Sequence, residues 1–124
     1  MVKSKLNIQR FADNREQFFK RVELSAKDQD HTAQYLLALS YSDGYGIPQN
    51  QVEAVKWMVA SAEAGNGDAQ CTLGFMFALG ECGVKQDYGE AHKWLLLAAD
   101  SGNKSAKQAL DYLKSQEGLD IGTH

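Results

Sequence analysis

The chain has 124 residues, of which 44% are hydrophobic and 23% charged, and one proline stands against 11 glycines. This composition excludes a proline-rich or intrinsically disordered chain and provides enough apolar surface for one domain with a hydrophobic core. The formal net charge is −3 and the sequence shows no basic stripe, which argues against a nucleic-acid-binding class.

Other classes are disfavoured by local sequence features. The first ten residues lack the apolar core of a secretory signal, and the longest apolar run, Leu95–Ala99, is far shorter than the roughly 20 residues that cross a bilayer. The two cysteines, Cys71 and Cys82, lack C-x-x-C spacing and have no histidine cluster beside them. We therefore expect no membrane contact, no metal, no cofactor and a reduced, cytoplasmic environment.

Hydrophobic spacing and capping signals predict about six helices along the chain. A capping pattern, an Asx residue followed three positions later by Glu, occurs at 13–16, 50–53 and 87–90, at intervals of 37 residues. We expect Gly65 and Gly102 to end helices in the left-handed conformation and Asp68 to cap the next helix. The predicted helices lie near residues 13–27, 31–42, 51–64, 68–79, 88–101 and 105–115.

The helices belong to an internal repeat. Residues 33–66 return as 69–103, with an offset of 36 that becomes 37 inside a glycine-rich turn, where an extra residue costs least. Trp57 and Trp94 occupy equivalent positions, which favours packing between helices over ligand stacking. The prediction is an all-α superhelix, a short solenoid of helix-turn-helix repeats in a single domain. Its predicted parts are a half-unit 13–29, units 30–66 and 67–103, a terminal half-unit 104–116 and a frayed polar tail 117–124.

Each full unit carries the pattern A-x-x-x-L-[GA]-x-x-[YF]-x-x-G-x-G-[VI], followed by E-A-x-K-W and A-x-x-G-N. This pattern resembles the Sel-one-like repeat, a relative of the tetratricopeptide repeat. It departs from the family pattern at the extra turn residue near Glu81 and Cys82 and in a first half-unit without tryptophan. The resemblance implies an adaptor or scaffold role, often in bacterial signalling or stress pathways.

Residues for catalysis are sparse. Cys71 and His92 form the only candidate pair for thiol chemistry, and nothing in their spacing brings them together. The Asx and Glu pairs recur with the repeat, which capping explains better than acid–base catalysis. The glycine turns follow helices and lack the lysine of a phosphate-binding loop. We expect a protein that is not an enzyme.

The candidate binding surface consists of residues that differ between units. By analogy with tetratricopeptide repeats, the first helix of each unit lines a concave groove, and large apolar residues there indicate a protein or peptide partner. The alternative is that residues 1–12, with Leu6, Ile8 and Phe11, fold over part of this apolar surface. The predicted partner-binding residues are Tyr35, Leu39, Asp43, Cys71, Phe75, Leu79, Gln108 and Tyr112.

The resulting hypothesis is a non-catalytic protein–protein interaction module, an adaptor or scaffold that binds a protein or peptide in its concave groove. An immunity protein or inhibitor that occludes a toxin or enzyme is the alternative. An enzyme that uses Cys71 is a third, less favoured hypothesis, because it needs an activated thiolate. The sequence leaves the oligomeric state open.

Overall fold

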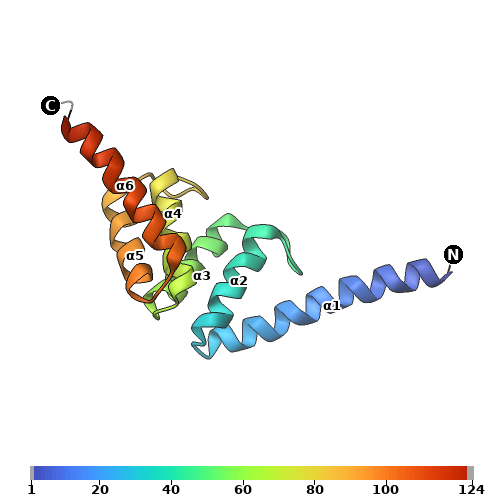
Figure 1. Ribbon diagram of the computed structural model, residues 1–124. Helices are drawn as coiled ribbons and strands as arrows, with labels where there is room; N and C mark the ends of the chain where they lie inside the picture. Colours follow the sequence, from blue (N-terminus) through green and yellow to red (C-terminus); the bar gives the residue numbers. More distant parts are fainter. Residues whose placement is uncertain (1, 123–124) are drawn as a thin grey trace.

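The computed structural model describes the backbone of residues 2–122 and the side chains of residues 13–115. Within that range the chain forms six α-helices and no β-strand, which confirms the predicted all-α class (Figure 1). The helices are α1 (Val2–Lys27), α2 (His31–Asp43), α3 (Gln51–Glu63), α4 (Gly67–Leu79), α5 (Tyr88–Asp100) and α6 (Lys104–Gly122).

The helices are stacked in chain order. The extensive contacts all join consecutive helices, from α1 against α2 to α5 against α6. Figure 1 shows the result, an elongated array in which α1 and α6 lie at opposite ends. This nearest-neighbour arrangement is that of a solenoid, in which each unit buries its apolar face against the next one.

Side-chain caps define the starts of the inner helices. The Oδ1 atoms of Asn50 and Asp87 accept hydrogen bonds of 3.1 Å from the backbone N–H groups of Glu53 and Glu90, as the sequence predicts. The cap of α4 differs from the prediction, because Asn66 and not Asp68 accepts the bond, from Ala69 N–H at 2.9 Å. Asn66 stands immediately before the helix, whereas Asp68 lies inside its first turn.

The two outer helices are longer than predicted. Asp13 lies inside α1 and not at its start, because residues 2–12 contain neither proline nor glycine and continue the helix towards the N-terminus. At the other end, α6 continues to Gly122 where a frayed tail was predicted, since no proline interrupts it. The alternative that Leu6, Ile8 and Phe11 fold over part of the predicted binding surface concerns side chains outside the described residues and stays a prediction.

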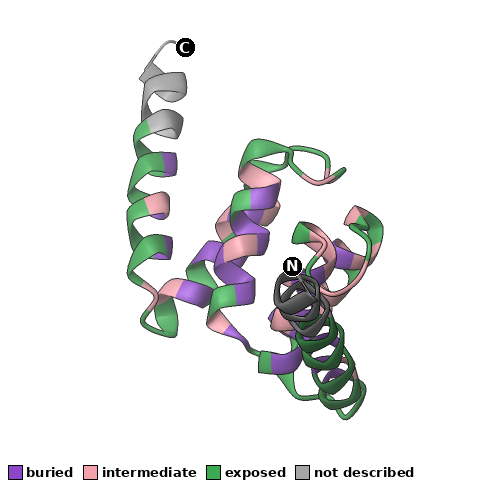
Figure 2. Cartoon of the chain, turned by 90° about the vertical axis from the view of Figure 1, so that its right-hand side faces the viewer, coloured by how far each residue is buried: buried purple, intermediate pink, exposed green. Residues whose placement is uncertain are grey.

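The core consists of three clusters where neighbouring helices meet (Figure 2). The N-terminal cluster joins α1 to α2: Phe19, Val22, Ala26, Ala33 and Leu37. The central cluster joins α2 through α5: Ala38, Met58, Ala62, Ala69, Leu73, Met76 and Trp94. The C-terminal cluster joins α4, α5 and α6: Cys71, Ala91, Leu95, Ala98, Ala106, Leu110 and Leu113.

A repeated hydrogen bond fixes each unit to the helix before it. The buried Nε2 of Gln34 donates to the carbonyl of Ala26 at 3.3 Å, and the equivalent Gln70 donates to the carbonyl of Ala62 at 3.1 Å. Each carbonyl also accepts a backbone N–H of the following turn at 3.1 Å, from Gln29 to Ala26 and from Gly65 to Ala62, so the glutamine adds a second bond at the helix end. The same device therefore sets the stacking of α2 on α1 and of α4 on α3.

Gly74 allows α4 and α5 to approach closely. A Cβ atom at this position lies only 2.6 Å from Leu95 Cγ and 3.3 Å from the carbonyl oxygen of Ala91. Leu95 is fully buried and the Ala91 carbonyl is part of the backbone, so relief of both contacts needs a shift of α5 relative to α4. The helix pair therefore requires glycine at this point of contact.

Substitution of Gly74 tests this contact. We expect Gly74→Ala to be about 1–3 kcal/mol less stable than Gly67→Ala, because its methyl group overpacks the helix interface. Gly67 lies in the same helix, and a Cβ there meets only Ser101, its Cβ at 3.5 Å and its Oγ at 4.0 Å, which are ordinary contacts. Urea denaturation followed by circular dichroism measures both, and equal stabilities would contradict the proposed close contact.

The tryptophans contribute unequally to the core. Trp94 is buried, with 7% of its surface exposed, whereas Trp57 is half-buried between the central and N-terminal clusters. The ammonium groups of Lys56 and Lys93 lie 5.9 and 4.9 Å from the ring centres of Trp57 and Trp94. Both rings therefore pack against the protein and carry a lysine on a face.

We expect Trp94→Ala to lower the free energy of unfolding by about 3–5 kcal/mol, because it leaves a large cavity among four helices. Trp57→Ala removes a ring that is already partly exposed and has a smaller effect. Chemical denaturation of both variants provides the measurement. A loss below about 1 kcal/mol in Trp94→Ala would place that ring outside the core.

Candidate functional site

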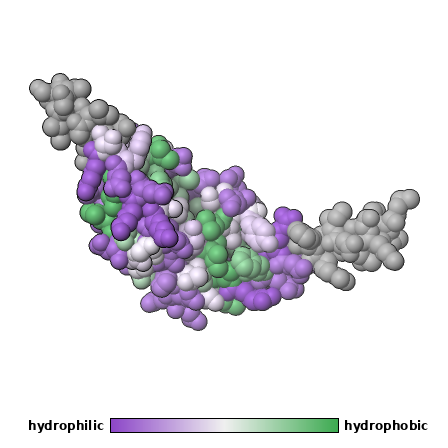
Figure 3. Space-filling view, in the orientation of Figure 1, coloured by the Kyte–Doolittle hydropathy of each residue, from purple (hydrophilic) through white to green (hydrophobic). Residues whose placement is uncertain are grey.

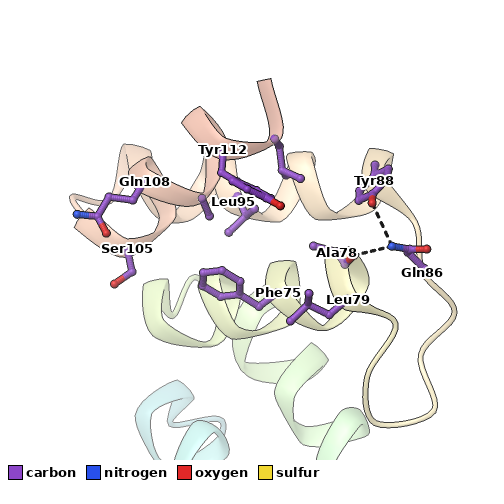
Figure 4. A pocket seen from close by; sticks show the side chains of 11 residues that line it. Phe75, Ala78, Leu79, Gln86, Tyr88, Leu95, Ser105, Gln108 and Tyr112 are labelled. Carbon is purple, nitrogen blue, oxygen red and sulfur yellow. Dashed lines mark hydrogen bonds between the residues drawn. The ribbon is translucent and has the colours of Figure 1, made fainter. Parts of the chain in front are cut away.

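A groove of about 590 Å³ lies between α4 and α6, with α5 behind it (Figure 4). Its walls come from three helices and from the loop between α4 and α5. The lining residues are Phe75, Ala78, Leu79, Gln86, Tyr88, Leu95, Ser105, Gln108, Ala109, Tyr112 and Leu113. Four of them, Phe75, Leu79, Gln108 and Tyr112, belong to the binding surface predicted from sequence.

The groove presents large apolar side chains to solvent. Phe75 and Leu79 stand one turn apart on α4, and Tyr112 lies across from them on α6 (Figure 4). Their exposed fractions are 38%, 61% and 64%, although each is a residue type that a protein normally buries or uses for contact. The fully buried Leu95 of α5 lies at the base. This arrangement provides the apolar anchor surface that protein interfaces favour.

The other four predicted residues lie elsewhere. Tyr35 and Leu39 are half-buried and pack against the central cluster, and Asp43 is exposed at the end of α2. Cys71 is only 6% exposed, because Ala106 and Leu110 of α6 pack on that side of α4. Its predicted exposure to a partner is therefore wrong. Helical spacing identified the face that carries Cys71 but not the helix that covers it.

The sequence reasoning missed the contribution of the α4–α5 loop. Gln86 Nε2 donates two hydrogen bonds, one of 3.0 Å to the carbonyl of Ala78 and one of 3.1 Å to the hydroxyl of Tyr88. The first bond fixes the loop to the end of α4, and the second fixes the tyrosine at the wall of the groove (Figure 4). Tyr88 follows directly after the helix cap Asp87, so its place in the chain suggested only a helix start.

The groove differs in polarity from the surface around it. None of its lining residues carries a formal charge, and its polar groups are amides and hydroxyls. Polar side chains cover much of the face seen in Figure 3, particularly over α5 and α6, and apolar side chains gather in separate patches. An uncharged concave surface excludes ionic recognition at its centre and favours apolar contacts with directed hydrogen bonds.

Other kinds of site find no support in the described part of the chain. No group of three or more His, Cys, Asp or Glu side chains is placed there to hold a metal ion. The helices searched include none with the length and apolar character needed to cross a bilayer. Cys71 and Cys82 are free thiols and pack in different clusters.

Comparison with known protein families identifies the two repeats of this architecture. The model of the Sel1 repeat matches residues 31–66 and 67–103, which together make up more than half of the chain. No curated protein matches the chain.

Two solved structures share the fold. A Sel1 repeat protein from Oxalobacter formigenes is 33% identical with a TM-score of 0.75, over 77% of this chain and 39% of that one. The second is c5321, a protective antigen present in uropathogenic Escherichia coli strains that displays an SLR fold. It is 28% identical with a TM-score of 0.76, over 80% of this chain and 21% of that one. The chain thus spans less than half the length of either protein, and with its two matched repeats it belongs to the Sel1 repeat family.

Proposed function

We propose that the chain is a non-catalytic interaction module that binds a protein or peptide segment in the groove between α4 and α6. The observation that carries this proposal is the exposure of Phe75, Leu79 and Tyr112 around one uncharged concavity. Apolar residues that serve only stacking are buried and recur unchanged in each unit. Phe75, Leu79 and Tyr112 are exposed and differ from their counterparts in the other units, and burial of such anchors accounts for most of the affinity in many interfaces.

The family supports the general class of this function. Sel1 repeat proteins generally act as protein-interaction scaffolds and are typically not catalysts. Both structural neighbours come from bacteria, which fits an adaptor in a bacterial cell. A cytoplasmic location for this chain belongs to the same proposal and fits its two free cysteines.

The inhibitor hypothesis uses the same groove. An immunity protein binds its toxin tightly and abolishes the activity of the toxin, whereas an adaptor leaves its partner active. Identification of the bound protein, followed by an assay of that protein with and without the chain, separates the two roles.

Substitutions in the groove test the proposal. We expect Phe75→Ala and Tyr112→Ala each to weaken binding of a co-purified partner by about 1–4 kcal/mol, because they remove anchors at the contact surface. Thermal stability should change little, since both side chains are exposed. Isothermal titration calorimetry measures the affinity of each variant.

Leu24→Ala serves as the control, because Leu24 is 68% exposed on α1 and lies outside the groove. It should leave the affinity unchanged. Unaltered affinity in both groove variants, with the fold intact, would assign binding to another surface.

The enzyme hypothesis depends on a reactive Cys71, and the surroundings of this residue oppose reactivity. Burial in the C-terminal cluster and the nearby carboxylate of Asp68 both raise the pKa of the Cys71 thiol. A raised pKa lowers the fraction of thiolate, which is the nucleophilic form. The cysteine therefore acts as a small packing residue between α4 and α6.

Thiol labelling checks this assignment. We expect iodoacetamide at neutral pH to modify Cys82, which is half-buried in the α4–α5 loop, about tenfold or more faster than Cys71, which must await local opening. In denaturant the two cysteines should react alike. Preferential modification of Cys71 in the folded protein would revive the catalytic hypothesis. Mass spectrometry of the labelled peptides distinguishes the sites.

A further inference from the structure

The hydroxyl of Tyr88 has a fixed hydrogen-bonding role. The amide of Gln86 has only one possible orientation, because the carbonyl of Ala78 at 3.0 Å needs a donor and must face Nε2. The same Nε2 therefore also acts as donor to the Tyr88 hydroxyl at 3.1 Å. Both hydrogens of the Gln86 amide nitrogen are then in use, and the Tyr88 oxygen acts as acceptor.

The consequence is a free donor at the wall of the groove. Since the oxygen of Tyr88 accepts the bond from Gln86, its own hydrogen is left to donate elsewhere. Tyr88 lines the groove and is 51% exposed, so this hydrogen is accessible to a bound molecule. Figure 4 shows the hydroxyl directed to the Gln86 side of the groove, beyond the apolar side chains of α4.

The first unit shows that this arrangement is not needed for stacking. Its equivalent glutamine, Gln49, also donates to the end of the preceding helix, at 2.7 Å from the carbonyl of Ser42. The position equivalent to Tyr88 is Gln51, and Gln49 has no tyrosine partner. The bond to the helix end is thus common to both units, whereas the bond to the tyrosine is special to the unit that contains the groove.

The chemistry of the lining restricts what the groove can hold. A charged group that enters it loses water and meets no opposite charge among the lining residues, which is costly. An apolar side chain faces Phe75, Leu79 and Leu95 without such a cost. A carbonyl group beside that side chain would accept the hydrogen of Tyr88.

We propose that the groove takes an uncharged peptide segment of a partner protein, whose aliphatic or aromatic side chain packs between α4 and α6 and whose backbone carbonyl accepts a hydrogen bond from Tyr88. Gln86 is a positioning residue that holds the Tyr88 hydroxyl as a donor. This inference rests on the proposed function and specifies the partner chemistry of the same groove.

The test uses a capped, soluble peptide of alanine and glutamine with two leucines one helical turn apart, and matched peptides with glutamate or lysine at both positions. Amide chemical shifts of the full chain report the binding site and the Kd. We expect the leucine peptide to shift resonances of α4, α6 and the α4–α5 loop and to bind more tightly than either charged peptide. Tyr88→Phe, which keeps the ring, should raise its Kd about threefold to tenfold, the effect of one neutral hydrogen bond.

Gln86→Leu should raise the Kd in the same direction, and the double variant should be no weaker than Tyr88→Phe alone, because both changes act on one bond. Gln49→Leu is the matched control. It removes the equivalent bond to a helix end in the first unit and should leave the Kd unchanged.

The outcomes separate this inference from the function on which it rests. If Phe75→Ala weakens binding of the leucine peptide but Tyr88→Phe does not, the groove binds peptides and the role of Tyr88 is wrong. Preference for a charged peptide would overturn the assigned partner chemistry. If the leucine peptide shifts no groove resonance at millimolar concentration, or if sedimentation shows that a second copy of the chain occupies the groove, the proposal fails as a whole.

Discussion

The contact between Gly74 and Leu95 is the constraint on which the rest of the second unit depends. It sets the separation of α4 and α5, since a single added methyl group at Gly74 would meet Leu95 Cγ at 2.6 Å. Leu95 also packs against α6 in the C-terminal cluster and forms the base of the groove. The depth of the groove and the packing of its two walls therefore follow from one close helix contact.

The repeat made the inner helices predictable. Each capping and packing position of the inner helices occurs in two copies, so two separate signals predict each type of helix boundary. The starts and ends of α2 through α5 agree with the expected ones to within about a residue. Asp13 shows the limit of this reasoning. Its capping pattern matches that of Asn50, but a cap forms only where the preceding residues leave the helix, and nothing before Asp13 makes them do so.

The candidate site was predictable only in part, for a similar physical reason. Phe75 and Tyr112 could be found because they are large, apolar and different from the residues that recur for stacking. Cys71 lies on the same side of α4, but Ala106 and Leu110 of α6 pack there and remove it from solvent. Gln86 and Tyr88 come from a loop whose path depends on a bond to the end of α4, a tertiary feature without a periodic signal.

The second wall of the groove depends on the packing of α6 against α4 and α5. α6 packs on the preceding helices through Ala106, Leu110 and Leu113, and the positions equivalent to Gly74 and Phe77 are Asp111 and Lys114, both exposed. α6 therefore presents polar groups where α4 presents the surface that pairs with α5. In a solenoid each element gains stability from its neighbours, so the position of α6 depends on its packing against α4 and α5. The width of the groove is thus linked to the stability of this interface, and we expect a change at Leu110 to alter the affinity of the proposed binding although Leu110 does not line the groove. A loss of binding is evidence about the groove surface only where the packing of α6 is shown to be intact.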